Sequence, residues 1–119
     1  MADLKGKPYS IHVHHGLKWV DPADGNADLE VKFEDGSRYA ATFFTLSNLR
    51  LLFEKNEQTG ECKDGLYLWA SDMVIVKELT EVSISETVAD LIGQGEFSGA
   101  FSELPPDAQS PASQEIRST

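Results

Sequence analysis

A β-hairpin encoded between residues 29 and 44 constrains the fold more than any other stretch of the chain. Apolar and charged residues alternate along its first half, and an Asp-Gly pair at 35–36 marks a tight turn. A three-residue loop over 34–36, with its glycine in the left-handed conformation, keeps the apolar side chains of both strands on one face. This register predicts that Val31 lies opposite Tyr39.

The remaining periodicity predicts a single α+β domain over residues 10–104. Alternation over 10–20 predicts a first strand, and apolar residues at helical spacing predict helices over 45–60 and 80–95. Between the helices, the apolar segment 66–76 fits either one bent strand or a short hairpin, so an extra strand stays open. The order β-β-β-α-β-α favours a small antiparallel sheet with the two main helices packed on one face.

Polar residues at the predicted helix ends support these boundaries. Thr45 is placed as the N-cap of the first helix, and Gly60 as the glycine that ends it. For the second helix, Ser83 and Glu86 have capping-box spacing, and Thr80 is a competing N-cap.

Both ends of the chain have few residues that could anchor them to a core. Residues 1–9 are expected to form a flexible lead-in. The last segment contains Pro-Pro, Ser-Pro and few apolar side chains, which predicts a disordered tail over 105–119.

The charge and cysteine content restrict the class of protein. A formal net charge of −10 argues against non-specific binding to DNA, RNA or an anionic membrane, because such binding needs clustered Lys and Arg. No apolar run approaches the ~20 residues that a membrane span requires, and the first residues show no signal-peptide core. Cys62 is the only cysteine, which is typical of a reducing compartment. We therefore expect a cytoplasmic protein.

The histidines of the first strand raise the question of a metal site. His12 and His14 are two residues apart, so on a strand they point the same way, and such a pair can chelate a divalent transition metal. An Asp or Glu from another element, or a residue of a second subunit, would have to complete the site, and no spacing in the sequence identifies it. A solvent-facing polar strand is the favoured interpretation. A metal- or small-ligand-binding domain that uses this pair is the alternative.

The sequence contains no catalytic motif. It lacks a P-loop, a G-x-G-x-x-G stretch and a G-x-S-x-G nucleophile elbow. Cys62 follows Glu61 at the predicted end of a helix, where the negative field disfavours the reactive thiolate. We expect a non-enzymatic protein that needs no cofactor.

Acidic residues are distributed unevenly along the chain. Residues 21–36 contain a single basic residue, Lys32, and no Lys or Arg occurs between Lys77 and Arg117. Such a distribution is either a solvated surface that aids solubility or an acidic field that attracts basic partners and speeds their association. The residues expected to contact such a partner are Asp21, Asp24 and Asp28 in the first acidic segment and Glu86 and Asp90 in the second predicted helix.

The favoured function is an acidic protein-interaction domain that binds a basic protein. Its physical type is that of an inhibitor, immunity-type or antitoxin-type protein. Trp19, Tyr67 and Trp69 are either aromatic anchors of that interface or members of the core. A short antiparallel sheet also leaves edge strands, through which two copies of the chain could pair as a homo-oligomer.

Overall fold

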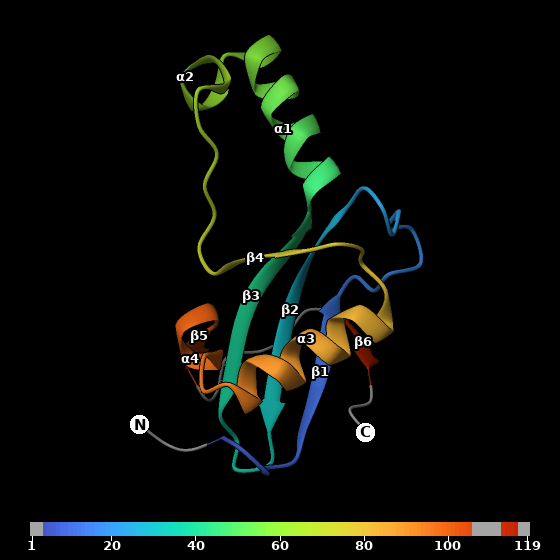
Figure 1. The fold of residues 1–119 in the computed structure, drawn as a ribbon, viewed down its shortest axis with the longest axis vertical. Coiled ribbons are helices and arrows are strands. Elements are labelled where there is room, and N and C mark those ends of the chain that lie inside the picture. Colours follow the sequence, from blue (N-terminus) through green and yellow to red (C-terminus); the bar gives the residue numbers. More distant parts are fainter. Residues whose placement is uncertain (1–3, 106–112, 117–119) are drawn as a thin grey trace.

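The structure is a computed structural model that describes residues 4–105 and 113–116, and these residues form a small α+β domain. The described part contains a six-stranded mixed sheet and four helices (Figure 1). In chain order these are β1 (Tyr9–His14), β2 (Asn26–Phe33), β3 (Arg38–Thr45), α1 (Leu46–Thr59), α2 (Glu61–Gly65), β4 (Met73–Val76), α3 (Glu81–Gly93), α4 (Phe97–Ala100), β5 (Ser102–Leu104) and β6 (Ser113–Ile116).

The sheet has the strand order β4-β3-β2-β1-β6, with β5 paired to the other end of β3. The first three strands form the expected antiparallel meander. The prediction of a purely antiparallel sheet is wrong at β4, which runs parallel to β3. Parallel neighbours need a long crossover connection, and residues 46–72 supply it. The apolar segment 66–76 holds only this one short strand, and the additional strands are β5 and β6.

The hairpin between β2 and β3 has the predicted register, with Val31 opposite Tyr39. Gly36 adopts a φ of +94°, and its N–H donates to the carbonyl of Phe33 at 3.0 Å. The N–H of Phe33 in turn donates to the carbonyl of Ser37 at 2.9 Å. These bonds close the three-residue loop in which a left-handed glycine is required.

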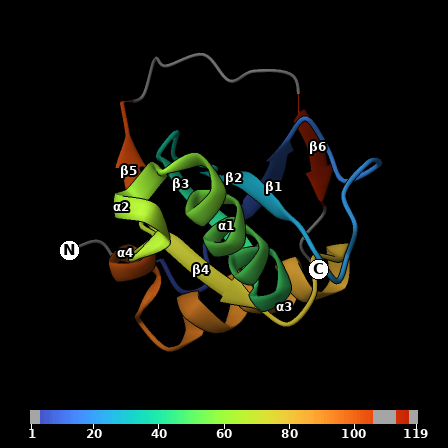
Figure 2. The same ribbon diagram turned by 90° about the horizontal axis from the view of Figure 1, so that it is seen from above.

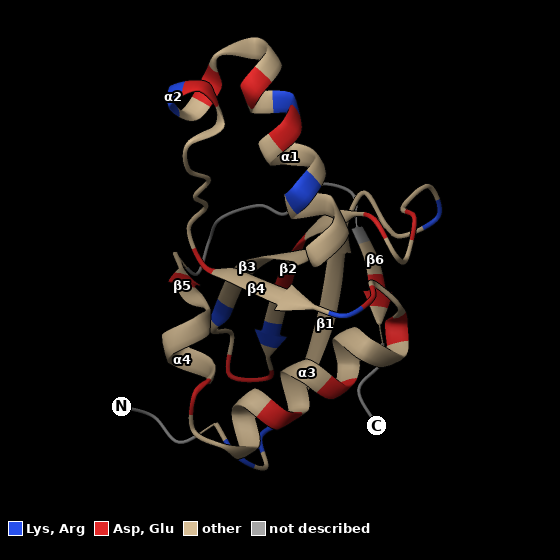
Figure 3. Ribbon diagram, turned by 45° about the horizontal axis from the view of Figure 1, so that its top comes forward, with Lys and Arg blue, Asp and Glu red and all other residues tan. Residues whose placement is uncertain are grey.

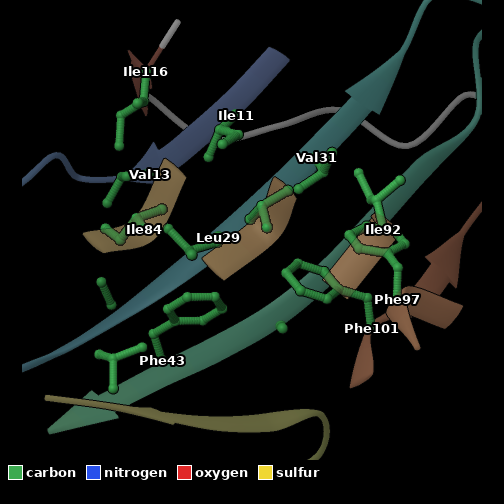
Figure 4. Close-up of a cluster of buried hydrophobic side chains, with 14 of the residues drawn as sticks. Ile11, Val13, Leu29, Val31, Phe43, Ile84, Ile92, Phe97, Phe101 and Ile116 are labelled. Atoms are coloured by element: carbon green, nitrogen blue, oxygen red, sulfur yellow. The ribbon is translucent and has the colours of Figure 1, made fainter. Parts of the chain in front are cut away.

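The hydrophobic core lies between one face of the sheet and α3 (Figures 1 and 4). Its centre consists of the buried side chains Ile11, Val13, Leu29, Val31 and Phe43 of the sheet, Ile84, Val88 and Ile92 of α3, and Phe97 and Phe101 from the α4 region. Phe97 and Phe101 stack with their ring centroids 4.4 Å apart. The amphipathic stripe of the second predicted helix therefore packs as the sequence indicates.

The two main helices begin and end close to the predicted boundaries. Thr45 caps α1 by accepting a hydrogen bond from the N–H of Asn48 at 3.2 Å, and Gly60 ends the helix with a φ of +84°. At α3, Thr80 is the N-cap that accepts from Ser83, so the capping box is not used. Within the described residues, no helix combines the length and the apolar character needed to cross a membrane.

The prediction that both helices pack on one face of the sheet is wrong for α1. This helix starts directly where β3 ends and extends away from the sheet, with α2 at its far end (Figures 1 and 2). No loop residue separates β3 from α1, so the chain has no room to fold the helix back over the sheet. Only Leu49 and Asn56 of this helix are buried. We call residues 46–72, which form α1, α2 and the segment returning to β4, the arm.

The predicted disordered tail is wrong for residues 113–116, which form β6 along the edge of β1. Ile116 lies opposite Ile11 and is 4 % exposed, so it belongs to the core. The Gln114 side chain accepts a hydrogen bond from the N–H of Leu17 at 2.9 Å. An open strand edge offers backbone partners that a composition-based prediction of disorder does not consider. Residues 106–112 and 117–119 of the predicted tail lie outside the described residues.

At the other end of the chain, β1 begins at Tyr9, and Leu4 packs against the core. Residues 1–3 of the predicted lead-in lie outside the described residues. The flexibility predicted for 1–9 stays a prediction.

Replacing Ile116 with alanine should lower the free energy of unfolding by about 2 kcal/mol or more, because the change leaves a cavity beside Ile11. Urea denaturation measures the loss. Val82→Ala is the control, since Val82 is 66 % exposed and should cost about 0.5 kcal/mol or less. Equal, small costs for both variants would mean that β6 does not form in solution.

Candidate functional site

The histidines of β1 lie on the sheet face opposite α3. Ile11 and Val13 point into the core, so His12 and His14 point the other way, as the alternation predicts. The Nε2 atom of His12 lies 2.9 Å from the hydroxyl of Ser10. The Nε2 atom of His14 is buried and has no hydrogen-bond partner within the described structure. It lies 3.6 Å from a carboxylate oxygen of Glu30.

Glu30 is the centre of a buried ion-pair network on this face. Its side chain is 1 % exposed and accepts two hydrogen bonds from Arg38, at 2.6 Å from Nε and 2.8 Å from Nη2. The hydrogen bonds to Glu30 raise the pKa of Arg38 above its ordinary value. Lys32 approaches the same carboxylate at 3.8 Å. Arg38 also donates from Nη1 to the carbonyl of Pro105 at 3.1 Å, so the network fixes the end of β5.

This network explains why the histidine pair lacks a metal-binding set. Both Glu30 oxygens already accept from Arg38, including the oxygen that lies 3.6 Å from Nε2 of His14. In the part of the chain that the structure describes, no group of three or more His, Cys, Asp or Glu side chains is arranged to hold a metal ion. The alternative of a metal domain based on His12 and His14 therefore finds no third ligand among these residues.

A cavity of about 260 Å³ lies where β1 ends and β2 begins, and it bears on the small-ligand alternative. Its lining includes His14, His15, Trp19 and Asp28, but His12 is not part of it. The volume falls below the ~300–1,000 Å³ of ordinary small-molecule sites. The two histidines thus do not share this cavity.

The five acidic residues expected at a partner interface are divided among three places (Figure 3). The backbones of Asp21 and Asp24 form an isolated antiparallel bridge across a tight loop. The side chain of Asp24 accepts a hydrogen bond from Asn48 of α1 at 3.5 Å, at the base of the arm. Asp28 lies on β2, where it accepts from Thr42 at 2.7 Å. Glu86 and Asp90 lie on the exposed side of α3. The structure does not bring these five residues into one surface.

The arm contains most of the exposed large hydrophobic side chains. Nine such side chains are found among the described residues, and three of them lie outside the arm, namely Trp19, Ile75 and Val82. The six in the arm are Leu46 at 65 %, Leu51 at 47 %, Phe53 at 37 %, Leu66 at 71 %, Tyr67 at 50 % and Trp69 at 71 % exposed. Of the two interpretations of Trp19, Tyr67 and Trp69, membership of the core is wrong. Sequence reasoning found these aromatics but missed the arm that presents them.

The tip of the arm has an unusual backbone. Cys62, Lys63 and Asp64 in α2 all adopt left-handed conformations, with φ between 51° and 56°. Each such residue costs roughly 1–2 kcal/mol, so the surrounding structure has to fix the turn. Gly65 supplies part of that support, since it packs so closely on α1 that a Cβ would lie 2.9 Å from the Phe53 carbonyl. Cys62 is only partly buried in this turn, and no contact with a histidine is seen among the described residues.

Breaking the ion pair at Glu30 should destabilise the fold strongly. We expect Glu30→Gln to lower the free energy of unfolding by about 3 kcal/mol, because Arg38 is left buried without its counter-charge. Lys32→Gln is the matched control, and the loss of this partly exposed lysine should cost about 1 kcal/mol or less. Urea denaturation compares the two variants. Similar costs would show that the buried pair contributes no more than a surface contact.

The pKa of His12 predicts a loss of stability in mild acid. Burial, and next the charge of Lys32, lower this pKa below its ordinary value of 6.5. The unfolded chain therefore binds the proton more readily, so the stabilisation is complete above 6.5 and is lost as the pH falls through the folded-state pKa. Between about pH 7.5 and 5, the wild type should lose more stability than His12→Gln. Parallel pH profiles of the melting temperature would contradict this.

Comparison with known proteins gives no match: no family model, no curated protein and no solved structure is similar to this chain. A fold by itself does not determine a function. The functional argument therefore depends on the geometry of the described residues, and the arm is the feature of that geometry that the packing of the domain leaves unexplained.

Proposed function

We propose that the chain is a non-enzymatic protein-binding domain whose arm is covered by a partner protein with an apolar contact surface and a basic rim. The observation on which the proposal depends is the exposure of six large hydrophobic side chains on the projecting arm. Scattered apolar residues are normal on protein surfaces, but their concentration on one element is typical of an interaction site. Trp and Tyr are also the residue types that contribute most to binding at interfaces.

The packing of α1 supports the same conclusion. Helices in globular proteins owe most of their stability to the burial of an apolar face. In α1 only Leu49 and Asn56 are buried, while Leu46, Leu51 and Phe53 remain exposed. A partner that covers the arm would supply the burial that the sheet does not provide.

The charge of the chain supports a basic partner. The formal net charge is −10, and Asp24 and Asp28 lie near the base of the arm, where Asn26 and Asn48 join β2 to α1 at 2.8 Å. These carboxylates are placed to meet Lys or Arg at the rim of an interface. Glu86 and Asp90 on α3 contribute to the longer-range field that steers such a partner toward the domain.

A small acidic domain that covers a basic protein has the physical character of an inhibitor, immunity-type or antitoxin-type protein. In such pairs the interface supplies the activity, and no catalytic group is needed. The absence of catalytic motifs in the sequence fits this class.

Site-directed photo-crosslinking tests the proposal. A photoreactive phenylalanine analogue is placed at Trp69 or, as a control of similar exposure, at Val82 of α3, and the protein is irradiated in its native host. We expect a basic protein to be captured at Trp69 and not at Val82. Binding of that purified protein should weaken at least ~10-fold with Tyr67→Ser and Trp69→Ser combined, since buried aromatic anchors contribute more than ~1.4 kcal/mol.

The control for affinity is Val82→Ser, which should change the dissociation constant by less than ~2-fold because the side chain lies outside the arm. Raising the salt concentration should slow association, as expected for oppositely charged surfaces. Equal capture at the two positions, or a partner whose binding ignores both the arm variant and salt, would refute the proposal.

A further inference from the structure

The outer edge of β4 is a strand edge with little protection. Natural edge strands are protected by charged residues, proline or bulges, yet Met73–Val76 has the sequence M-V-I-V and contains none of these. Its short length is its main protection. Ile75 is 55 % exposed, and from Gly65 to Val76 the only charged residue is Asp72. In a chain with a net charge of −10, a stretch of twelve residues with a single charge stands out.

The register with β3 determines which backbone groups of β4 face outward. The N–H of Thr42 donates to the carbonyl of Asp72 at 3.0 Å, and the parallel ladder continues from Thr42 opposite Met73 to Thr45 opposite Val76. In such a ladder alternate residues bond to the neighbouring strand, which here are Val74 and Val76. The N–H groups of Met73, Ile75 and Lys77 therefore point away from the sheet, as do the carbonyls of the first two.

No hydrogen bond within the described structure engages these outward groups. Strand β5 occupies only the far end of β3, beside residues 38–40, and leaves the β4 edge open. Each outward group can pair with an added strand, and the spacing of Met73 and Ile75 matches the alternation of an antiparallel or a parallel partner.

We propose that the partner protein adds an extended segment to the sheet along β4, with apolar residues over Ile75 and Lys or Arg at its ends. This inference rests on the proposed function, and it names the element through which the partner is held. The β4 edge is continuous with the returning segment of the arm, so one bound segment can contact Trp69 as well as β4. Asp72 and Glu78 flank the strand, and Lys77 is the only basic residue beside it, so the flanks keep a net negative charge that basic ends would complement.

A second copy of the chain is a poorer occupant of this edge. Two copies would bring together surfaces that each have a net charge of −10, and this repulsion opposes association. If two β4 strands paired in antiparallel fashion, with Ile75 of one copy opposite Ile75 of the other, Asp72 would also lie opposite Glu78 at both ends of the pair. A segment with basic ends avoids both penalties.

Nuclear magnetic resonance with a model segment tests the inference. The probe is a capped octapeptide of alternating valine and threonine with lysine at both ends. On its addition, the amide protons of Met73, Ile75 and Lys77 should shift and exchange at least ~10-fold more slowly with solvent, because they gain hydrogen bonds. The same peptide with glutamate ends should bind at least ~5-fold more weakly, and alternate N-methylation should abolish binding.

Ile75→Pro removes one outward N–H without breaking the ladder to β3, since proline is tolerated at a strand edge. This variant should lose peptide binding and keep its melting temperature within a few degrees of the wild type. Ile75→Thr is the matched control, because it retains the N–H and a β-branched side chain, and it should bind within ~3-fold of the wild type.

The remaining outcomes separate this inference from the proposed function. Peptide shifts confined to Leu66–Trp69, unaffected by N-methylation, would overturn strand addition and leave the arm as the binding element. Failure of the crosslinking experiment at Trp69 would overturn the proposed function, whatever the octapeptide does. Protection of the Ile75 amide in the protein alone, lost on dilution, would show that a second copy occupies the edge and would overturn the inference.

Discussion

The register of β2 against β3 determines which side chains the sheet buries and which it leaves on its other face. With Val31 opposite Tyr39, the apolar residues of both strands face α3. The same alternation places Glu30 and Arg38 together on the opposite face, where they form the buried ion pair. A slip of one residue would move the carboxylate into the apolar core and the core residues to the other face. The ion pair and the core therefore stabilise the same register from both sides.

The position of the arm follows from the point at which β3 ends. Thr45 is buried, accepts from the N–H of Gly25 at 3.1 Å and caps α1 with the same hydroxyl. The last residue of the strand is thus also the N-cap of the helix, and the direction of the helix is set by the direction of the strand. Nothing in this junction turns α1 toward the sheet, and its hydrophobic side chains stay exposed. Regions with so few buried contacts open locally more easily than the core.

Local patterns in the sequence predicted much of this fold. The hairpin register, the helix boundaries and the caps at Thr45 and Gly60 depend on residues a few positions apart, and the structure confirms them. The parallel pairing of β4 and the addition of β6 depend on residues far apart in the chain. Ile116 is one apolar residue in a polar segment, so no periodicity marks it as part of the core. These features could not be read from local spacing.

The candidate site was partly within reach of the sequence. Once the hairpin register is known, Glu30 falls opposite Ala40, diagonal to Arg38, so the ion pair could have been predicted. The exposed arm could not, because the spacing of Leu46, Leu49 and Phe53 in α1 suggests a face for packing on the sheet. Amphipathic spacing indicates that a helix has an apolar face, but it does not say whether the same chain or another protein covers it.

The division of the acidic residues assigns different physical roles to the two sides of the molecule. Asp28 lies on the sheet face opposite α3, whereas Glu86 and Asp90 lie on the exposed side of α3. At physiological salt, exposed charges more than ~8–10 Å apart are largely screened from one another, and the two groups lie on opposite sides of the domain. A single partner seated on the arm therefore cannot pair directly with both groups. In the proposed complex, the carboxylates near the base of the arm would affect how long the complex lasts, while those of α3 would affect how fast it forms.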